Sequence, residues 1–572
     1  MYVEVVPNRN SPPAVLLREG WREGGKIRKR TVANLSKWPK HRIEMLRRLL
    51  RDEPLMGPDD VFSIERSLPH GHVAAILGTI GRIGLDKIIA AKRSRQRDLV
   101  VAMIAQRLIA PRSKLETVRL WQTTTLGQEL NVLDADEDDL YGAMDWLLTR
   151  QDRIEQKLAG RHLKQGGLVL YDVSSSYFEG RSCPLAQFGY NRDGKKGKPI
   201  VVYGMMADSD GRPVAMEVYP GSTGDPTTVP DQVEKLRERF GLEHIVLVGD
   251  RGMLTETQVG HLREHPGLGW ISALRSTAIR TLVESGQLQL SLFDEHNLAE
   301  ITSPDFPEER LVTCYNPLLA EERRRKREEL LTATEQLLEG IVREVSRRTN
   351  TPLGKVEIAE KVGKKKNKYK VGKHFDVTIE DGYFCFSRRE DQIRREADLD
   401  GIYVIRTSEP AERLSAQEAV RNYKNLTLVE SAFRCLKGVD LRIRPINHYR
   451  ERRVRAHIFL CMLAYYVEWH MRKAMAPLLF QDEQLDELRH TRDPVARTTA
   501  SDSAKRKKIR STDTSDAPPT QSFGSLMANL ATLCRNQCRL WAEPNAPAVD
   551  RLTTPSPLQT KAMQLLGLNC SQ

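Results

Sequence analysis

The segment LVLYD (residues 168–172) is a short apolar run that ends in an aspartate. Its composition predicts a buried β-strand. The runs PIVVYGMMAD (199–208) and RPVAMEVYPGS (212–222) flank an Asp-Gly turn and predict a β-hairpin. A capped helix is expected over 225–241, and HIVLVGD (244–250) predicts a further buried strand. Because a helix crosses to this last strand, we expect parallel pairing in a mixed sheet.

Asp172 and Asp250 follow the first and the fourth of these strands. If the two strands are parallel neighbours, both carboxylates lie at the same end of the sheet, where α/β proteins hold their sites. Two close carboxylates repel each other unless a cation neutralises them, and hard oxygen ligands favour Mg²⁺ or Mn²⁺. For one aspartate alone, a turn or cap role would be the commoner explanation. The pair together favours a metal site.

The segment YKNLTLVESAFRCLK (423–437) predicts one amphipathic helix with Glu430 at the edge of its apolar stripe. Tyr423 and Lys437 lie seven residues to either side, almost two turns away. With the stripe packed on the sheet, Glu430 would be a third metal ligand. Arg434 and Lys437 would hold a phosphate, and Tyr423 would contact a DNA end. Without the two aspartates, an ordinary helix with a Glu430–Arg434 ion pair would be preferred.

The chain has 572 residues and a net charge of +13, from 89 Lys and Arg against 76 Asp and Glu. This length predicts several structural units, and the basic excess favours a nucleic-acid partner, although composition alone also fits a basic protein without one. The eight cysteines include no CxxC pair, which indicates free thiols in a reducing compartment. The start of the chain lacks an apolar leader and no apolar run is long enough to span a bilayer. We therefore expect a cytoplasmic, nucleoid-associated protein.

Tyr423, Glu430 and Lys437 match the third motif Y-x2-R-x3-E-x6-K of a known family. With Asp172, Asp250 and the GDRG that includes the second aspartate, the chain resembles bacterial insertion-sequence DDE transposases of the insertion-sequence-four type. The interruption between the second and third acids also fits this branch. The chain differs from the motif at Leu426, where the family has arginine, and Arg434 or a lysine of the insertion would replace that contact.

The resemblance implies a ribonuclease-H-like α/β fold, with a mixed sheet flanked by helices and interrupted by a charged, β-containing insertion. It implies that Asp172, Asp250 and Glu430 are catalytic and hold two Mg²⁺ ions, with Mn²⁺ as a substitute. The expected activity is cleavage at transposon ends and strand transfer into target DNA, by a homodimer on double-stranded DNA (terminal inverted repeats and target). The alternatives are a related nuclease that does not join strands, and a catalytically inactive DNA-binding remnant, which the three intact acids disfavour.

Further regions surround this predicted core. The expected division is an antiparallel β-module (1–37), a helical DNA-binding region (38–164), the first part of the catalytic core (165–274), the charged insertion (275–400), the rest of the core (401–475), a flexible linker (476–522) and a C-terminal helical segment (523–572). The helices predicted over 97–111 and 113–124 form either a DNA-reading helix-turn-helix or ordinary helical packing. Within the insertion, a basic run with an interleaved tyrosine is the leading candidate for phosphate contacts, through Lys364, Lys365, Lys366 and Lys368.

Overall fold

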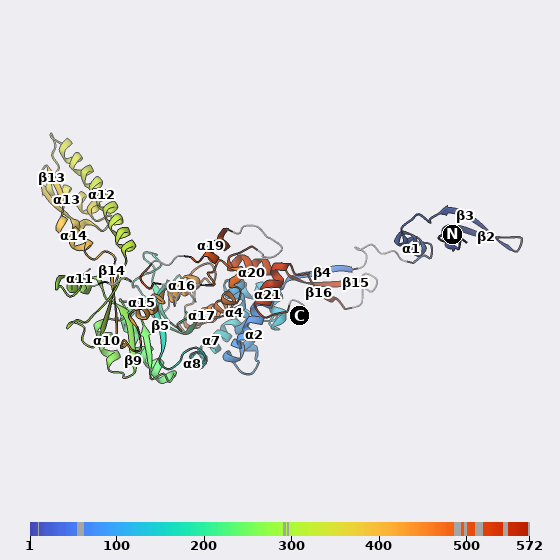
Figure 1. Cartoon of the computed structure of the whole chain (residues 1–572), viewed down its shortest axis with the longest axis horizontal. Coiled ribbons are helices and arrows are strands. Elements are labelled where there is room, and N and C mark those ends of the chain that lie inside the picture. Colours follow the sequence, from blue (N-terminus) through green and yellow to red (C-terminus); the bar gives the residue numbers. More distant parts are fainter. Residues whose placement is uncertain are drawn as a thin grey trace. The chain divides into compact units, whose positions relative to one another are not determined.

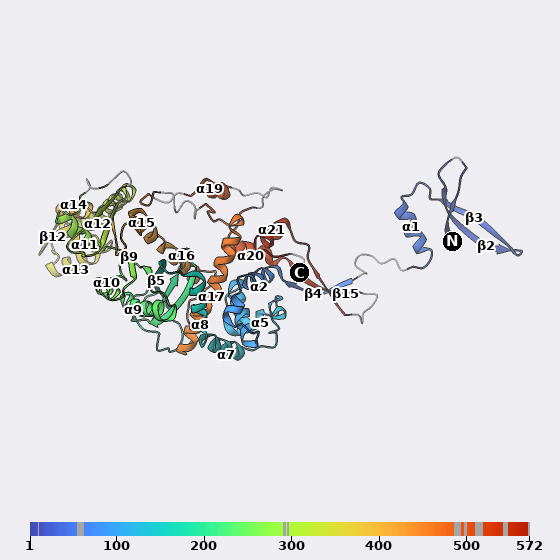
Figure 2. The ribbon, with the colours of Figure 1, turned by 60° about the horizontal axis from the view of Figure 1, so that its bottom comes forward.

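In a computed structural model, the chain forms two compact units. One comprises Met1–Pro69 with Leu533–Thr554, and the other His70–Thr532 with Pro555–Gln572. Figures 1 and 2 show the ribbon of both. The structure describes residues 1–9, 11–53, 62–289, 293, 297–484, 493–496, 500–509, 519–540 and 547–569. Within these residues no helix is long and apolar enough to cross a membrane, and each cysteine is a free thiol.

The first unit begins with a three-stranded antiparallel sheet in the order β1-β2-β3. Its strands are β1 (Tyr2–Val6), β2 (Ala14–Glu23) and β3 (Lys26–Asn34), followed by helix α1 (Lys40–Leu49). Gly24 and Gly25 join β2 to β3 with positive φ angles of 54° and 74°, which the tight turn requires and glycine tolerates.

The second sheet of this unit corrects two predictions. Strand β15 (Cys534–Leu540) pairs antiparallel with both β4 (Phe62–Pro69) and β16 (Val549–Leu552). Residues 38–164 and 523–572 were both expected to be helical, yet each contributes strands here. In the C-terminal segment expected to be helical (523–572), the helices are α20 (Phe523–Ala531) and α21 (Pro557–Leu565). Local periodicity does not reveal these strands, because their partners lie in the opposite terminal region of the chain.

The second unit contains a helical body around two buried helices, α4 (Arg95–Ile109) and α17 (Glu451–Ala474). On α4 every residue from Asp98 to Leu108 is buried, so this helix forms part of a core. Its burial favours ordinary packing over a DNA-reading pair with α5. The other helices of this body are α2 (Gly71–Ile83), α3 (Leu85–Ile89), α5 (Lys114–Leu120), α6 (Leu126–Glu129), α7 (Glu137–Leu148) and α8 (Gln151–His162).

An eight-stranded mixed sheet forms the other half of this unit, in the order β10-β11-β14-β9-β8-β5-β6-β7. Strand β5 pairs antiparallel with β6 and parallel with β8, and β8 is parallel to β9. The predicted ribonuclease-H-like mixed sheet, flanked by helices, is thus confirmed in β5 to β9. These strands are β5 (Gly167–Tyr177), β6 (Ile200–Ala207), β7 (Pro213–Pro220), β8 (Ile245–Val248) and β9 (Leu268–Ala273). Short helical segments connect these strands. Between β7 and β8 lie η2 (Asp225–Thr228), α9 (Val229–Glu234) and η3 (Lys235–Arg239), and between β8 and β9 lies α10 (Glu256–Arg263).

The region expected as a separate insertion contributes partly to this sheet. Strand β14 (Ile402–Thr407) pairs with β9, and β11 (Arg310–Tyr315) lies between β14 and β10 (Leu298–Ile301). The rest has an apolar core of its own and projects from the sheet (Figure 1). Its elements are α12 (Pro317–Arg347), α13 (Lys355–Lys366), η5 (Gly372–His374), β12 (Phe375–Glu380), β13 (Tyr383–Arg388) and α14 (Glu390–Ala397), while α11 (Ser276–Glu284) packs near β14.

Helices α15 (Ala416–Lys424) and α16 (Leu426–Lys437) lead from β14 towards α17. After α17 come η6 (Ala476–Leu478) and α19 (Asp502–Ile509). Much of the linker expected over 476–522 lies outside the described residues, and α19 is a helical part of it.

Candidate active site

The register of two parallel strands places Asp172 and Asp250 at equivalent positions. Leu170 of β5 pairs with Val248 of β8, and each aspartate stands two residues further along. The predicted neighbouring, parallel arrangement of the two strands is therefore present. The expectation that the strand ends at Asp172 was wrong, because β5 continues to Tyr177. The pairing of β5 with β8 stops before Asp172, whereas its pairing with β6 continues, and Met205 of β6 is the partner of Asp172.

Asp172 is half-buried, and its Oδ1 accepts a hydrogen bond of 2.8 Å from the Val173 N–H. Burial raises the pKa of Asp172 to about 7, because water no longer stabilises the charged form. The negative charges of Asp250 and Glu430 raise this pKa further, whereas Arg192 and the Val173 hydrogen bond oppose the rise. The three predicted acids therefore share one electrostatic environment.

Glu430 is presented by α16, which packs on β5. The apolar face of α16 is buried, and Phe433 lies edge-on to Tyr203 of β6, with ring centroids 5.8 Å apart. Glu430 itself is exposed, at the edge of this face. In the described chain no ion pair joins Glu430 to Arg434, whose guanidinium instead donates to Ser431 Oγ at 2.7 Å. Glu430 is thus free to act with the two aspartates.

The prediction of one continuous helix over 423–437 was wrong. Asn425 separates α15 from α16, and the Leu428 N–H bonds back only three residues, to the Asn425 carbonyl. Thr427 Oγ1 also donates to the Lys424 carbonyl at 2.8 Å, which supports the break. A side chain that hydrogen-bonds the backbone in this way competes with regular helix geometry.

Tyr423, at the end of α15, reaches one of the acids. Its hydroxyl donates a hydrogen bond of 3.2 Å to Asp250 Oδ1. Burial, followed by the charge of Asp250, raises the pKa of Tyr423, so the phenol stays protonated as a donor. The two residues are 173 positions apart, and the sequence pattern did not predict their contact.

Lys437 already has an anionic partner within the protein. Its Nζ lies 3.0 Å from Asp193 Oδ1, and Arg444 pairs with the same carboxylate. Asp193 also accepts the Tyr177 N–H at 3.1 Å, and its side chain is only 1% exposed. Its pairing with Lys437 across 244 positions has no local signal in the sequence.

Arg192, the residue before Asp193, is a second contribution that the sequence did not reveal. Its guanidinium contacts both oxygens of Asp225 at 2.5 Å, which holds the cation in place. That charge lowers the pKa of Asp172 against the effect of burial. The acidic site therefore has one fixed cation next to it.

Leu426 occupies the position where the family motif has arginine. It is 7% exposed and belongs to the apolar face of α16. A charged side chain in this orientation would lie in the packed interior, so the substitution by leucine suits the local structure.

The four predicted lysines lie on α13 and in the following turn, in the part of the insertion that projects from the sheet (Figure 1). Lys364 pairs with Glu360 at 2.5 Å, and Lys368 lies 5.1 Å from the centre of the Tyr369 ring. Lys365 and Lys366 are half-buried. The structure does not bring these lysines together with the three acids.

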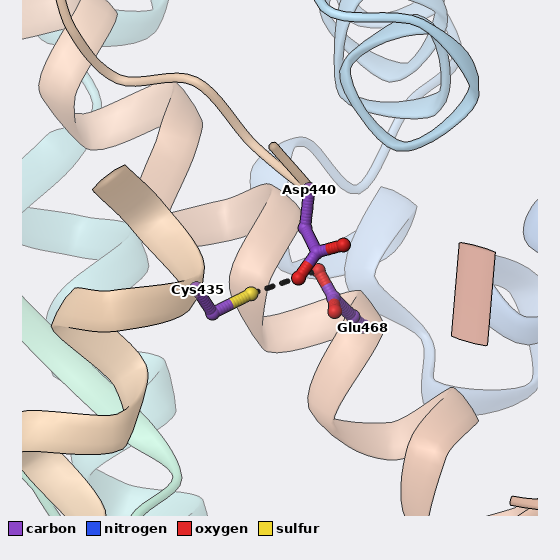
Figure 3. A group of neighbouring side chains, drawn as sticks. All are labelled: Cys435, Asp440 and Glu468. Carbon is purple, nitrogen blue, oxygen red and sulfur yellow. Dashed lines mark hydrogen bonds between the residues drawn. The ribbon is translucent and has the colours of Figure 1, made fainter. Parts of the chain in front are cut away.

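Among the described residues, one group of three potential metal ligands has its atoms within 4.8 Å of one another: Cys435, Asp440 and Glu468 (Figure 3). Cys435 Sγ donates to Glu468 Oε2 at 3.2 Å. Arg472 contacts Glu468 at 2.6 Å and Asp440 at 3.3 Å, so a guanidinium already neutralises these carboxylates. The group is best explained as a polar connection between α16 and α17 and not as a metal centre.

The donor chemistry of Asp172, Asp250 and Glu430 fits a divalent cation. All three offer carboxylate oxygens, which Mg²⁺ and Mn²⁺ prefer. Burial raises the pKa of Asp172 to about 7, and a cation bound beside it would favour the ionised form. In the described structure no arginine is bonded to these three acids, whereas Arg472 is bonded to two members of the Cys435 group.

Comparison with known proteins places this geometry in a family. Residues 167–467 match the transposase DDE domain, and residues 3–55 match the N-terminal domain of IS1634 family transposases. A search of curated proteins gave no match. A cryo-EM structure of a piggyBac transposase synaptic complex with hairpin DNA aligns with 78% of this chain and 80% of that chain, at 11% identity and a TM-score of 0.36, too weak a likeness to bear on the fold.

The DDE domain covers more than half of the 572 residues and contains all three predicted acids. Both matched domains belong to transposases of mobile DNA. The chain therefore belongs to the insertion-sequence DNA transposases with a DDE domain, enzymes that cleave and join DNA strands with the help of divalent metal ions.

Proposed function

We propose that Asp172, Asp250 and Glu430 are the catalytic acids of this transposase and that they hold two Mg²⁺ ions, for which Mn²⁺ can substitute. The observation that carries this assignment is the strand register, which sets the two aspartates at equivalent positions on β5 and β8. The electrostatic effect of Glu430 on Asp172 supports the third member.

Bound metal ions would activate a water or hydroxyl nucleophile and stabilise the charge that develops on the leaving oxygen of a phosphodiester. The surrounding side chains prepare the acids for this role. The Tyr423 hydroxyl fixes one oxygen of Asp250, which limits rotation of that carboxylate. Arg192 favours the ionised form of Asp172, the form that binds a cation.

Two of the substrate contacts that we propose, Arg434 and Lys437, lie on the same helix as Glu430. Arg434 is exposed and makes only a short-range bond to Ser431, so it is available for a phosphate. Lys437 is held by Asp193, and a phosphate would have to compete with that carboxylate. Tyr423 and the lysines Lys364, Lys365, Lys366 and Lys368 complete the proposed DNA contacts.

On this basis the enzyme, acting as a homodimer on DNA in the nucleoid, hydrolyses one strand at each terminal inverted repeat. The freed 3′-hydroxyl then attacks a phosphodiester of the target, and the bond to the target strand's 3′ oxygen breaks as the new bond forms. No external energy source is needed, because one phosphodiester replaces another.

The test is strand cleavage and strand transfer on duplexes that carry the ends flanking the gene, with and without Mg²⁺. Asp172→Asn and Glu430→Gln should each lower both activities by at least about a hundredfold, as expected when a charged ligand is removed from the reacting site. Glu264→Gln, an exposed acid on another surface, is the matched control and should stay active. Full activity of either of the first two variants would refute the assignment.

A further inference from the structure

A cavity of about 300 Å³ lies between the helical body and the segment that follows α16. Residues from the end of α4, the start of α5, α7, the loop before α17 and α17 itself line it. Among the described residues of its lining there is no carboxylate. Six cationic side chains line it: Arg107, Arg112, Lys114, Arg442, Arg444 and Arg453. Such a concentration of one charge in a concave site is characteristic of anion binding.

Lys114 is the most informative of these residues. It is 5% exposed, and it has no hydrogen-bond or ion-pair partner among the described residues. Burying an ammonium group without a counter-charge is costly, and proteins normally pair such a group. A second unsatisfied donor lies nearby, because the buried Nε of Arg453 also has no partner. The guanidinium of Arg453 rests over the Tyr141 ring, 4.1 Å from its centre, which holds it at the cavity wall.

Three of the other cations, Arg107, Arg112 and Arg444, already have partners within the protein, and Arg442 is exposed to solvent. Arg107 donates to the Leu441 carbonyl at 3.3 Å, and Arg112 pairs with Glu116 at 3.1 Å. Burial, and then the neighbouring charge of Arg107, lower the pKa of Lys114 to about 7. Burial also lowers the pKa values of the two histidines of the lining, His448 and His457, which therefore supply no charge at neutral pH. Among the cations of the lining that are withdrawn from solvent, the positive charge that lacks a partner is therefore centred on Lys114 and Arg453.

Arg444 connects the cavity with the candidate active site. It lines the cavity and also pairs with Asp193, the carboxylate that holds Lys437 of α16. Its Nε donates to the Lys437 carbonyl at 3.3 Å. A DNA strand that reaches Lys437 would therefore have its neighbouring phosphates close to this cavity.

We propose that this cavity binds a phosphate of the substrate DNA backbone, with Lys114 and Arg453 as its direct ligands. The aromatic rings of Tyr141 and Tyr449 line the same space and offer a surface for the attached sugar. The inference deepens the proposed function, on which it rests for DNA as the substrate. The site is separate from the three acids, so its loss weakens binding without removing the chemistry.

The test measures the salt dependence of DNA binding by the full-length protein, using a fluorescent 30-base-pair duplex at pH 7. Removing one phosphate contact reduces the slope of log Kd against log salt by about 0.9 and weakens binding by about five- to tenfold at 0.1 M salt. We expect this change for Lys114→Met and also for Lys114→Gln, which keeps a polar side chain. Lys87→Met removes an exposed lysine of α3 and should leave the slope unchanged. Thermal unfolding of each variant verifies that it is folded.

An unchanged slope in both Lys114 variants would overturn the inference. A second result would point to a small anion as the ligand of the cavity. In that case the slope would stay constant, while inorganic phosphate or ATP at fixed ionic strength would raise the Tm of the wild type but not of Lys114→Met. This result would also overturn the inference. Neither result touches the three acids, which are tested by cleavage in Asp172→Asn. Conversely, cleavage that survives in Asp172→Asn would refute the active site and leave the binding result standing.

Discussion

Asp172 and Asp250 occupy equivalent places on two parallel neighbouring strands, each two residues beyond the paired residues Leu170 and Val248. Beyond this level β8 has ended, whereas β5 continues alongside β6. One aspartate is therefore held within a long strand, and the other lies in the loop where the shorter strand stops. This difference explains why Asp172 is half-buried while Asp250 is exposed.

The first prediction concerns metal binding without DNA. Mn²⁺ added to the wild-type protein should raise its Tm, because a ligand that binds only the folded state stabilises it, by about 2.7 kcal/mol at a hundred times Kd. Asp172→Asn should show little of this gain, and Glu264→Gln should show all of it. Differential scanning calorimetry at fixed ionic strength measures the effect. Equal gains in Asp172→Asn and wild type would contradict the proposed ligand set.

Tyr423→Phe removes the hydrogen bond to Asp250 and little else. A hydrogen bond to a charged group contributes about 1.5–3 kcal/mol, which predicts a roughly ten- to hundredfold lower cleavage rate. Single-turnover cleavage at saturating protein measures this rate, and DNA affinity measured alongside reports separately on the proposed contact of Tyr423 with DNA. If the affinity falls and the rate does not, Tyr423 contacts DNA and does not position Asp250.

Arg472→Met should destabilise the protein. Glu468 is fully buried, and the substitution removes the guanidinium that contacts it at 2.6 Å. Breaking a buried ion pair by removing one partner costs about 3–5 kcal/mol. The double variant Arg472→Met/Glu468→Gln should recover much of the loss, whereas the exposed Arg434→Met should cost less than about 0.5 kcal/mol. Urea denaturation measures all three, and an unaltered midpoint for Arg472→Met would exclude this structural role.

Leu426→Arg, which restores the residue of the family motif, is expected to harm this protein. The guanidinium would enter the apolar face of α16, where it has no counter-charge, at a cost of several kcal/mol. Ser431→Arg, at an exposed position of the same helix, is the control and should fold normally. A stable and more active Leu426→Arg protein would show that the position faces the substrate after all.

Lys114→Met should stabilise the folded protein in a pH-dependent way. The pKa of Lys114 is about 7 in the folded state and near 10.5 when unfolded. Between these values the unfolded chain binds more protons, so wild-type stability rises with pH through this range. The unfavourable effect of the buried charge is complete below pH 7 and fades towards pH 10. The gain in Tm on substitution should therefore be several degrees at pH 6 and much smaller at pH 9.5.

The charged groups around Lys114 define what else titrates in that experiment. His448 and His457 stay neutral because burial lowers their pKa values. Cys461 is the remaining titratable neighbour, and burial raises its pKa. A gain in Tm that does not vary with pH would show that Lys114 is not buried as a charge.

Short-range patterns in the sequence were enough to predict the central sheet and its paired aspartates, because strand, helix and turn signals follow one another between 168 and 250. The position of Glu430 followed from helical periodicity. The break at Asn425 did not, since it depends on a hydroxyl-to-backbone bond that periodicity ignores. The pairing of β4 with β15 also could not be predicted from the sequence, because the two strands come from opposite terminal regions.

The cations around the acids were also beyond prediction. Arg192 acts on Asp172 only because Asp225 holds it, and Lys437 is neutralised by Asp193 only in the folded chain. Polar residues in a loop carry no periodic signal that would identify such partners. The sequence therefore indicates the candidate acids, whereas the residues that position them emerge only from the folded structure.

The most direct test of the central claim is cleavage of transposon-end DNA by Asp250→Cys in Mg²⁺ and in Mn²⁺. If Asp250 binds the metal, a sulfur ligand should abolish activity with Mg²⁺, which prefers oxygen, and restore part of it with the softer Mn²⁺. Asp250→Ala should be inactive with both ions. Equal activity of Asp250→Cys in the two ions, at the wild-type level, would contradict the account.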